Sequence, residues 1–591
     1  MIVSTAYRTV LGPGRSAVAR FLFAPIVCWL AAQVAAVEPE LKTIHPLGGS
    51  RGTTTEVVLS GTGFEQGGEL HFGSPGITSE HIEKNRFRVL VSANSPLGDC
   101  DVWVATSAGL AGPRRFAVSD LPVLVEESAN DSMDAAQPIS VPAIVDGRFD
   151  STDSDWFSFS GNAGQIVTIS TRSKSLDGTA QPVVTLFGPL GLERAHSQAY
   201  RAEPVLNLRL PDSGEYRLLL RDRAYRGGDS SCYRLSIVTG PRMVQAIPHV
   251  IRARDANSTD GKVDVTLLGF ELPGAKPYFE SRLLQEWTVP DCTLERSPRQ
   301  QACFLSTAAY MLQGSTLHHH SLNGAARVVF SAEPVVSDSE DELSGPQPIS
   351  LPCRVAGQFQ QRGDVDRFRF SAQKDDSLQV ESFGERLDQW MDLEIAIQDA
   401  DGKEITVLPD LAAPKGIPAE LPLASLDAAG SWKVPADGEY DLVIRDLYGG
   451  SIFGPDRIYQ LLLRRLTPAF HVVAMVPHDK PSRGVSLRRA DSAELKLIAI
   501  RSGGFAGPIH VRALCPPQGV SVDPCTISEQ EVTKTIKINA PASSPIGTHT
   551  LRLVAEAQIG SDKHVVPVRS AARVSADATR LTDGTVFQIR D

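Results

Sequence analysis

Two Asp-x-Asp pairs stand out as residues able to do chemistry: Asp153 with Asp155, and Asp364 with Asp366. Residues two apart in a strand share one face, so each pair would place two carboxylates side by side. Carboxylate oxygens are ligands of hard cations such as Ca²⁺, which takes about six to eight of them. This interpretation predicts two calcium sites, each completed by oxygens from nearby loops.

A purely structural interpretation fits the same four residues. Asp153 and Asp364 would make Asx turns, while Asp155 and Asp366 would accept hydrogen bonds from a neighbouring backbone or an arginine. We favour this alternative, in which the protein needs no cofactor. It predicts little or no change in melting temperature with millimolar Ca²⁺, whereas calcium binding predicts a clear rise.

Other polar residues are expected to organise loops rather than to bind ligands. Asp222 and Asp446 each follow an arginine at the end of a strand-like segment, and we expect their carboxylates to hold the loops that come next. The run 318–320 consists of three histidines. Neighbouring side chains on a strand point to opposite faces, so the three cannot all face one metal ion. We expect an exposed loop there.

The sequence lacks the most common zinc-peptidase motif, His-Glu-x-x-His. It also lacks the nucleotide-binding patterns Gly-x-Gly-x-x-Gly and the P-loop. Strand-like segments occupy nearly every stretch of the chain, so no region is left for a separate catalytic domain. We therefore predict no catalytic residues and no enzyme activity.

Seven cysteines follow residue 36, and four of them form pairs that are close in sequence. Cys292 with Cys303, and Cys515 with Cys525, would each close a short loop as a disulfide in an oxidising compartment. No Cys-x-x-Cys motif or nearby histidine pair accompanies them, which argues against zinc. The remaining three cysteines are expected to be small buried apolar residues.

The first 36 residues have the order of a secretory signal peptide. Arg8, Arg15 and Arg20 precede an apolar stretch at 21–32, and small residues follow up to Ala36. The apolar stretch is shorter than the roughly 20 residues that a spanning helix requires, and no later segment is long enough. We expect cleavage after Ala36, no transmembrane anchor after cleavage, and a periplasmic, cell-surface or extracellular location.

The composition is that of a folded, acidic protein. Hydrophobic residues make up 42% and charged residues 21%, and the 48 glycines and 40 prolines indicate many turns rather than long helices. The formal net charge of −11 argues against a nucleic acid as partner, because phosphate neutralisation needs a basic surface. An extracellular protein or polysaccharide is the expected partner.

The chain contains an internal repeat. The segment 137–149 (QPISVPAIVDGRF) returns 210 residues later at 347–359 (QPISLPCRVAGQF), and 214–222 (GEYRLLLRD) returns at 438–446 (GEYDLVIRD). In both copies apolar and polar residues alternate over short runs punctuated by Gly, Asp and Pro, which is the period of β-strands. We predict an all-β protein of tandem antiparallel β-sandwiches, Ig-like and jelly-roll-like.

The predicted organisation is a duplicated pair of domains followed by one further module. Each long copy of the repeat is preceded by a shorter domain, and a fifth domain follows the second pair. The predicted boundaries are a signal peptide 1–36, a first domain 37–120, the first long copy 124–240, a third domain 241–334, the second long copy 335–466, a fifth domain 467–575 and a C-terminal tail 576–591.

These segments resemble known modules of exported bacterial proteins. The long copies resemble the bacterial pre-peptidase C-terminal domain in a glycine, the Asp-x-Asp pair, a Gly-x-Tyr strand and a closing tyrosine strand. The matching residues beside the aspartates are Gly147, Tyr216 and Tyr233, then Gly357, Tyr440 and Tyr459. The domains that precede them resemble IPT/TIG immunoglobulin-like modules, and the last resembles an Ig-fold module. The alternation is similar to large exported proteins of planctomycete-type bacteria.

The resemblance implies fold far more than chemistry. We expect a non-catalytic exported protein that acts in adhesion, scaffolding or substrate binding. The alternative is an ancillary part of a secreted peptidase system, in keeping with the family's occurrence as an appendage of peptidases, or a cryptic hydrolase. Hydrolysis of casein by the purified chain, lost on mutation of a single Ser or His, would identify a hydrolase.

Overall fold

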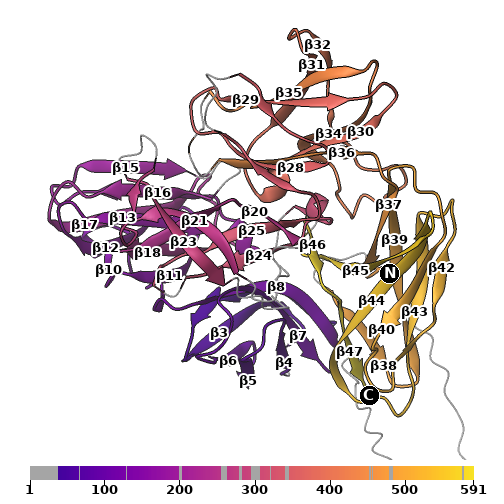
Figure 1. Ribbon diagram of the computed structural model, residues 1–591. Coiled ribbons are helices and arrows are strands. Elements are labelled where there is room, and N and C mark those ends of the chain that lie inside the picture. Colours follow the sequence, from indigo (N-terminus) through magenta and orange to yellow (C-terminus); the bar gives the residue numbers. More distant parts are fainter. Residues whose placement is uncertain are drawn as a thin grey trace, which may run out of the picture. The chain divides into compact units, whose positions relative to one another are not determined.

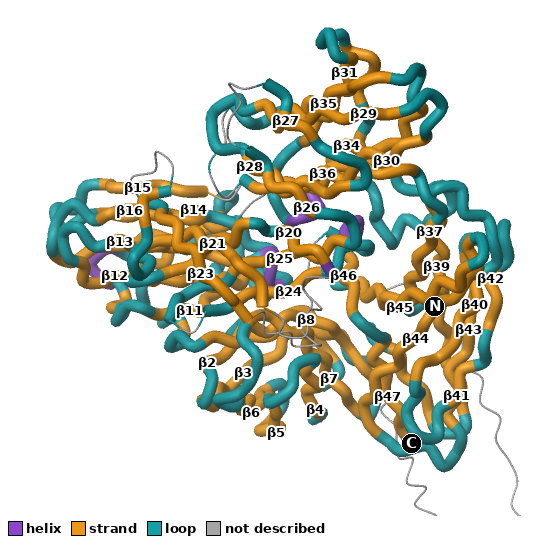
Figure 2. Tube along the Cα trace, viewed as in Figure 1, coloured by secondary structure: helices purple, strands orange, loops and turns teal. Residues whose placement is uncertain are grey.

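The computed structural model describes residues 38–591, except 65–66, 128, 199–202, 254–261, 279–282, 294–305, 320, 340–344, 451–453, 455–456, 478–482 and 576–577. The predicted signal peptide lies outside the described residues. Strands make up nearly all the regular structure in this part of the chain (Figure 2), which confirms the predicted all-β class. Across the same residues, no helix has the length and apolar character needed to cross a bilayer.

The first sandwich packs two four-stranded sheets against each other, in the orders β1-β3-β6-β5 and β2-β8-β7-β4. Its core takes side chains from both sheets, including Phe87 of β6 and Phe116 of β8. Buried and exposed residues alternate along β6, as expected for a strand with one face on the core. The strands are β1 (Glu40–His45), β2 (Gly48–Ser50), β3 (Thr53–Thr62), β4 (Glu69–Phe72), β5 (Ile77–Glu83), β6 (Arg86–Val91), β7 (Gly98–Thr106) and β8 (Gly109–Ser119).

The second sandwich contains the first long copy of the repeat. Its sheets have the orders β10-β12-β17-β14-β15 and β16-β13-β18-β11-β9. Phe157 and Phe159 of β12 face Val145 and Ile169 of the other sheet across the core. The elements are β9 (Val123–Val125), η1 (Met133–Ala135), β10 (Gln137–Pro138), β11 (Ala143–Arg148), β12 (Asp155–Gly161), β13 (Ile166–Arg172), η2 (Lys174–Leu176), β14 (Pro182–Phe187), β15 (Glu193–Gln198), β16 (Val205–Arg209), β17 (Gly214–Asp222) and β18 (Cys232–Thr239).

The third sandwich is the smallest, with a four-stranded sheet β19-β21-β23-β22 and a three-stranded sheet β20-β25-β24. Leu267 of β21 and Val328 of β25 join the two sheets in one core. The elements are β19 (Arg242–Ile247), β20 (Val250–Arg252), β21 (Lys262–Phe270), β22 (Lys276–Pro277), β23 (Gln285–Thr293), η3 (Thr307–Ala309), β24 (Gly314–Leu317) and β25 (Ala326–Ser331).

The fourth sandwich repeats the second. Its sheets β27-β29-β35-β31-β32 and β26-β28-β36-β30-β34-β33 keep the same strand order, with β33 added at one edge. The register is also kept, because Gly147 pairs with Tyr233 and Gly357 pairs with Tyr459. The elements are β26 (Val335–Ser337), β27 (Gln347–Pro348), β28 (Cys353–Gln358), β29 (Val365–Ala372), β30 (Ser377–Phe383), η5 (Glu385–Leu387), β31 (Leu393–Asp399), β32 (Glu404–Val407), β33 (Asp410–Leu411), β34 (Ser425–Lys433), β35 (Gly438–Asp446) and β36 (Ile458–Arg465).

The last sandwich is built from the strands that follow, drawn in orange to yellow in Figure 1. Its main path is β38-β47-β44-β45-β37-β39-β43-β41, while β40, β42 and β46 pair beside it. The strands are β37 (Ala469–Met475), β38 (Val485–Arg488), β39 (Asp491–Ser502), β40 (Ile509–Leu514), β41 (Ser521–Val522), β42 (Cys525–Ile527), β43 (Thr533–Ala540), β44 (Gly547–Ile559), β45 (Asp562–Arg573), β46 (Thr579–Thr582) and β47 (Thr585–Arg590).

The predicted C-terminal tail 576–591 is wrong. Strand β46 pairs with β45, and β47 pairs with both β38 and β44. Phe587 and Ile589 are fully buried in the core of the last sandwich, so removing them from that core would expose two large apolar side chains to water. The last sandwich therefore extends to residue 590.

Candidate metal centre

The predicted pair Asp153 and Asp155 lies beside a third carboxylate, that of Glu126. One oxygen from each residue lies within 4.8 Å of the other two. Two oxygens bound to one Ca²⁺ ion at about 2.4 Å are separated by at most about 4.8 Å, so the spacing suits three ligands of a single ion. Among the described residues, this is the one group of three acidic, cysteine or histidine side chains with such spacing.

Three segments of the second sandwich bring these carboxylates together. Glu126 directly follows β9 and extends the pairing of β9 with β11 by one more backbone hydrogen bond. Asp153 lies in the loop that leads into β12, and Asp155 is the first residue of that strand. The N–H of Trp156 donates to the carbonyl oxygen of Asn130 (2.8 Å), which holds the segment after β9 against β12.

Tyr233 packs against Gly147 at the edge of this group. A Cβ atom at Gly147 would lie 2.3 Å from the Tyr233 Oη and 2.6 Å from the Glu126 Oε2. Only glycine leaves room for both side chains, which explains the glycine at this point of the repeat. Burial, together with the charges of Asp155 and Glu126, raises the pKa of Tyr233 well above its usual value, so the hydroxyl keeps its proton.

Two side chains in the group are buried and lack partners. Asp155 is 0% exposed and Asn130 is 1% exposed. Neither the Asp155 carboxylate nor the Asn130 side-chain amide forms a hydrogen bond of full geometry among the described residues, although the Tyr233 hydroxyl and the Glu126 carboxyl lie close enough to Asp155 to affect its ionisation. An unpaired buried polar group costs about 1–3 kcal/mol, and more when it is charged. The arrangement is therefore unfavourable unless a ligand or a proton completes it.

The ionisation of these acids depends on whether a cation lies between them. Burial, followed by the charge of the neighbouring Glu126 carboxylate, raises the pKa of Asp155 to about 10. Burial also raises the pKa of Glu126. Two carboxylates in a site of low polarity resist ionising together, whereas a cation between them lowers the pKa of both. Without a cation, Asp155 holds its proton at neutral pH.

The group opens onto a pocket of about 690 Å³ that the first sandwich helps to form. His45, the last residue of β1, lies in its wall, and burial followed by the charge of Arg148 lowers the pKa of His45 to about 4. His45 is therefore neutral at physiological pH and adds no positive charge to the pocket. The other lining residues are Val58, Ser60, Glu126, Asn130, Asp131, Arg148, Asp150, Ser151, Thr152, Asp153, Ser154 and Asp229.

The predicted pair in the fourth sandwich, Asp364 and Asp366, has a different environment. Asp366 is 5% exposed, and its Oδ2 accepts a hydrogen bond from the Tyr459 hydroxyl at 2.5 Å. Asp364 accepts hydrogen bonds from the backbone of its own loop, including Gln360 N–H at 2.8 Å. Asp338 stands where the second sandwich has Glu126, with a matching backbone hydrogen bond. Asp366, the buried aspartate of this pair, is thus hydrogen-bonded within the protein.

The structural interpretation of the aspartates is therefore right for some of them and wrong for others. Asp153 accepts backbone N–H groups from Asp150 and Ser154, so it holds its own loop as predicted. The predicted backbone or arginine partner of Asp155 is wrong, because no partner meets it among the described residues. Asp366 accepts a hydrogen bond from the Tyr459 hydroxyl.

Asp222 and Asp446 confirm the prediction that they organise loops. Asp222 accepts the N–H groups of Ala224 (2.8 Å) and Gln181 (2.7 Å). Asp446 accepts hydrogen bonds from the N–H of Tyr448 (3.0 Å) and from the side chain of Arg457. These carboxylates are thus bound to backbone groups on both sides of their loops.

The histidine run is less exposed than predicted. His318 and His319 are half-buried, and the ring of His319 makes an edge contact with Trp287 at 5.1 Å between centroids. Its Nδ1 lies 2.9 Å from the Ser321 hydroxyl. His320 lies outside the described residues.

The predicted disulfide between Cys515 and Cys525 is wrong, because both are free thiols. Cys525 lies opposite Val511 in the pairing of β40 with β42, and β40 runs on for three more residues before Cys515. At about 3.3 Å per residue the two cysteines are on the order of 10 Å apart, beyond the reach of a disulfide. Cys303, and with it the predicted Cys292–Cys303 bridge, lies outside the described residues.

Glu126, Asn130 and Tyr233 complete the group but were not predicted as site residues. A sequence signal for Glu126 exists, since an acidic residue stands at the matching position of both copies, as Glu126 and Asp338. Tyr233 was identified only as the closing tyrosine of the repeat. Its proximity to the carboxylates depends on the pairing of β18 with β11, which sequence spacing does not reveal.

Comparisons with known proteins add distant likenesses to solved structures. No protein-family model matches the chain, and no curated protein matches it either. A solved structure titled "1.0 Angstrom Crystal Structure of pre-Peptidase C-terminal Domain of Collagenase from Bacillus anthracis" is similar to 23% of this chain and 100% of its own, with 10% identity and a TM-score of 0.15.

Proposed function

We propose that this chain is a non-catalytic β-sandwich protein whose second sandwich binds calcium, and that it acts in binding or scaffolding outside the cytoplasm. The observation that carries the calcium proposal is the buried, unpartnered Asp155 beside Glu126 and Asp153. Buried charges are kept in proteins when they are paired or when they coordinate metals. In the described part of the chain, no arginine or lysine forms an ion pair with any of these three residues.

The ligand chemistry favours calcium over other cations. The three carboxylates and the Asn130 amide offer oxygen atoms only, which suit hard cations. Asp131 and Asp150 in the pocket wall, together with water, can supply the further oxygens that Ca²⁺ requires. Mg²⁺ demands a smaller, near-octahedral shell and keeps more of its water, so it suits this wide, carboxylate-rich pocket less well.

An extracellular setting is consistent with this chemistry. Calcium sites of extracellular modules bind at about 10⁻⁴–10⁻³ M, a range matched to the calcium level outside cells. The signal-peptide pattern of the first 36 residues and the acidic net charge of −11 also support export. The binding or scaffolding role rests on the tandem sandwiches and on the lack of zinc-peptidase and nucleotide-binding motifs in the sequence.

Calcium titration of the purified full chain tests the proposal. We expect millimolar Ca²⁺ to raise the melting temperature, and Mg²⁺ at the same concentration to do so much less. Calorimetric titration in buffers of different ionisation enthalpy should detect proton release of about one proton per ion, because Asp155 must lose its proton to become a ligand. Binding without any proton release would contradict the role of Asp155.

Matched variants locate the ion. Asp155→Asn should abolish the calcium response, while Asp366→Asn, the same change in the fourth sandwich, should leave it intact. An equal loss in both variants, or none in either, would refute the assignment to the second sandwich. Casein hydrolysis by the purified chain, lost on replacement of one Ser or His, would overturn the non-catalytic role.

A further inference from the structure

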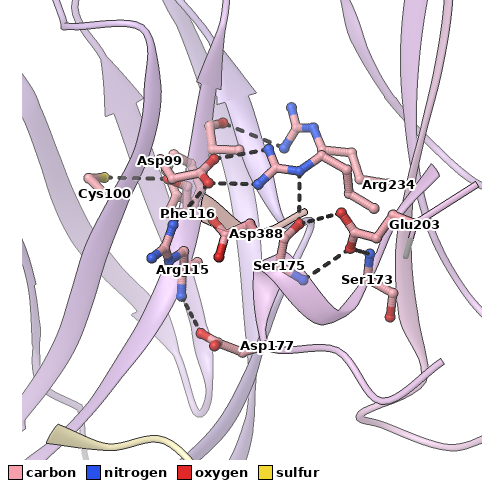
Figure 3. Close-up of polar contacts among 12 residues, drawn as sticks. Asp99, Cys100, Arg115, Phe116, Ser173, Ser175, Asp177, Glu203, Arg234 and Asp388 are labelled. Carbon is pink, nitrogen blue, oxygen red and sulfur yellow. Dashed lines mark hydrogen bonds and ion pairs between the residues drawn. The ribbon is translucent and has the colours of Figure 1, made fainter. Parts of the chain in front are cut away.

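Asp177, at the end of the η2 turn, contacts three sandwiches at once. Its backbone has a left-handed conformation (φ 66). Its Oδ2 accepts the N–H of Arg115 in the first sandwich at 2.8 Å (Figure 3). Its Oδ1 is ion-paired with Arg580 of β46 in the last sandwich. Side chains of Asp177 and Arg580 are only 8% and 7% exposed.

Arg580 binds a second carboxylate from another sandwich. Its Nη1 lies 2.7 Å from the Oδ1 of Asp101, on β7 of the first sandwich. One guanidinium thus holds two aspartates from two different sandwiches. Arginine suits this role because its planar fork presents several N–H groups in fixed directions. Removal of the guanidinium would leave two nearly buried carboxylates facing the space it had occupied.

A neighbouring ion cluster joins the first two sandwiches. Asp99 of β7 accepts hydrogen bonds from Nη2 of Arg172 at 2.6 Å and from Nη1 of Arg115 at 3.1 Å. Arg172 belongs to β13 of the second sandwich, so this pair also crosses between domains. Figure 3 shows Asp99 and Arg115 above Asp177 in one continuous polar network.

Strand β47 and its neighbour β38 continue the same junction. The Nε2 of Gln588 donates to the Thr106 carbonyl oxygen (2.9 Å), and Arg590 donates to the Ala108 carbonyl oxygen (2.7 Å). The N–H of Leu110 donates to the Ser486 hydroxyl oxygen (2.7 Å). The N–H of Gly484 in turn donates to the Leu110 carbonyl oxygen (2.8 Å). Strand β47, strand β38 and the residue before β38 thus form hydrogen bonds with the β7–β8 hairpin of the first sandwich.

This junction borders a large cavity. The cavity has a volume of about 1410 Å³ and is lined by residues from all five sandwiches, among them Asp99, Arg172 and Gln460. Ala578 and Thr579, directly before Arg580, form part of its wall. Movement of β46 away from the first two sandwiches would therefore open the cavity as well as break the ion pairs.

We infer that β46 and β47 form a clasp, with Arg580 as its central cation, that holds the last sandwich against the first two and closes the cavity. The clasp depends on the Arg580 charge because Asp101 and Asp177 share it. Without that charge the two carboxylates lose the cation that they share and separate into water, which releases the junction while each sandwich keeps its own core.

Hydrogen exchange on the full chain tests the clasp, because the amides of Leu110, Arg115 and Gly484 each donate across the junction. In Arg580→Gln we expect these amides to exchange at least tenfold faster than in the wild type. The amides of β39 and β43, inside the last sandwich, should exchange at unchanged rates. Arg580→Lys, which keeps the charge and loses the fork, should show a smaller acceleration of the same amides.

The control is Arg512→Gln, which removes an ion pair with Glu556 within the last sandwich. It should leave the junction amides protected. Unchanged exchange at the junction in Arg580→Gln would overturn the inference. So would an equal acceleration in β39 and β43, because it would mean that Arg580 stabilises the last sandwich itself. If Arg580→Gln does not fold, Arg580→Lys carries the same comparison, and unchanged junction exchange in that variant would be the refuting result.

Discussion

Asp155→Asn should make the second sandwich more stable in the absence of calcium, and it should remove the stabilisation of this sandwich by calcium. The substitution keeps the size of the side chain but removes the ionisable group. In the wild type, burial and Glu126 raise the pKa of Asp155 from 3.8 to about 10. Unfolding at neutral pH therefore releases a proton that the folded state holds, which favours the unfolded chain.

The magnitude follows from the distance between pH 7 and the unfolded pKa of 3.8, which is about three pH units. Each unit corresponds to about 1.36 kcal/mol, so the metal-free wild type is destabilised by up to about 4 kcal/mol at pH 7. Because the folded pKa is raised, this loss grows as the pH rises from about 4 towards 10 and is absent below pH 4. Asparagine carries no such penalty.

Calcium narrows the difference between the two proteins. Millimolar Ca²⁺ is about ten times a dissociation constant of about 10⁻⁴ M and stabilises the wild type by about 1.4 kcal/mol, and we expect no gain for the variant. Hydrogen exchange at the slowest amides of β12 and β17 measures the unfolding free energy of this sandwich within the full chain. The measurements should be made at pH 5 and pH 7, each with and without millimolar Ca²⁺.

Asp366→Asn is the matched control, because Asp366 accepts the Tyr459 hydroxyl hydrogen bond and has a bonded partner to lose. It should destabilise the fourth sandwich at either calcium concentration. A metal-free Asp155→Asn that is less stable than the wild type at pH 7 would refute the unpaired-acid reasoning. Calcium stabilisation that persists in Asp155→Asn would refute the ligand assignment.

Two further predictions concern the repeat and the thiols. Gly357→Ala should destabilise the fourth sandwich by about 3 kcal/mol in urea unfolding, because the new Cβ would lie 2.1 Å from Tyr459 Cζ. The control is Gly438→Ala, where nothing lies within 4 Å of the new Cβ; it should lower the free energy of unfolding by about 1 kcal/mol or less. Under native non-reducing conditions a thiol reagent should label the exposed Cys515 rapidly, and peptide mass spectrometry should find no Cys515–Cys525 bridge; a bridged peptide would contradict the geometry of β40 and β42.

The strands and their duplication could be predicted from the sequence because both depend on patterns of neighbouring residues. Alternation in 214–222 places Tyr216, Leu218 and Leu220 on one face, and these residues are buried in β17. The repeated glycine and tyrosine also keep their positions, since Gly147 faces Tyr233 and Gly357 faces its counterpart. A period of two fixes the buried face of a strand whatever it pairs with.

The errors share a different cause, which is dependence on partners far away in the chain. The sequence alone led us to predict a tail at β47, because part of the burial of this strand comes from the first sandwich, where Gln588 donates a hydrogen bond to the Thr106 carbonyl oxygen. Cys515 and Cys525 look like a bridge because they are close in sequence, but β40 runs on past the point where Cys525 pairs. Sequence separation does not measure distance across a sheet.

By itself, the sequence determined the class of fold, the duplicated unit and the four aspartates, since each depends on residue type and short spacing. Only the tertiary structure decided the surroundings of each buried aspartate. Asp366 accepts a hydrogen bond of 2.5 Å from the Tyr459 hydroxyl, whereas Asp155 lies beside the carboxylates of Glu126 and Asp153. Glu126, which follows β9, is one methylene longer than Asp338, which follows β26 at the matching position. The place of such a side chain depends on the packing of strands that are distant in sequence, which no local pattern encodes.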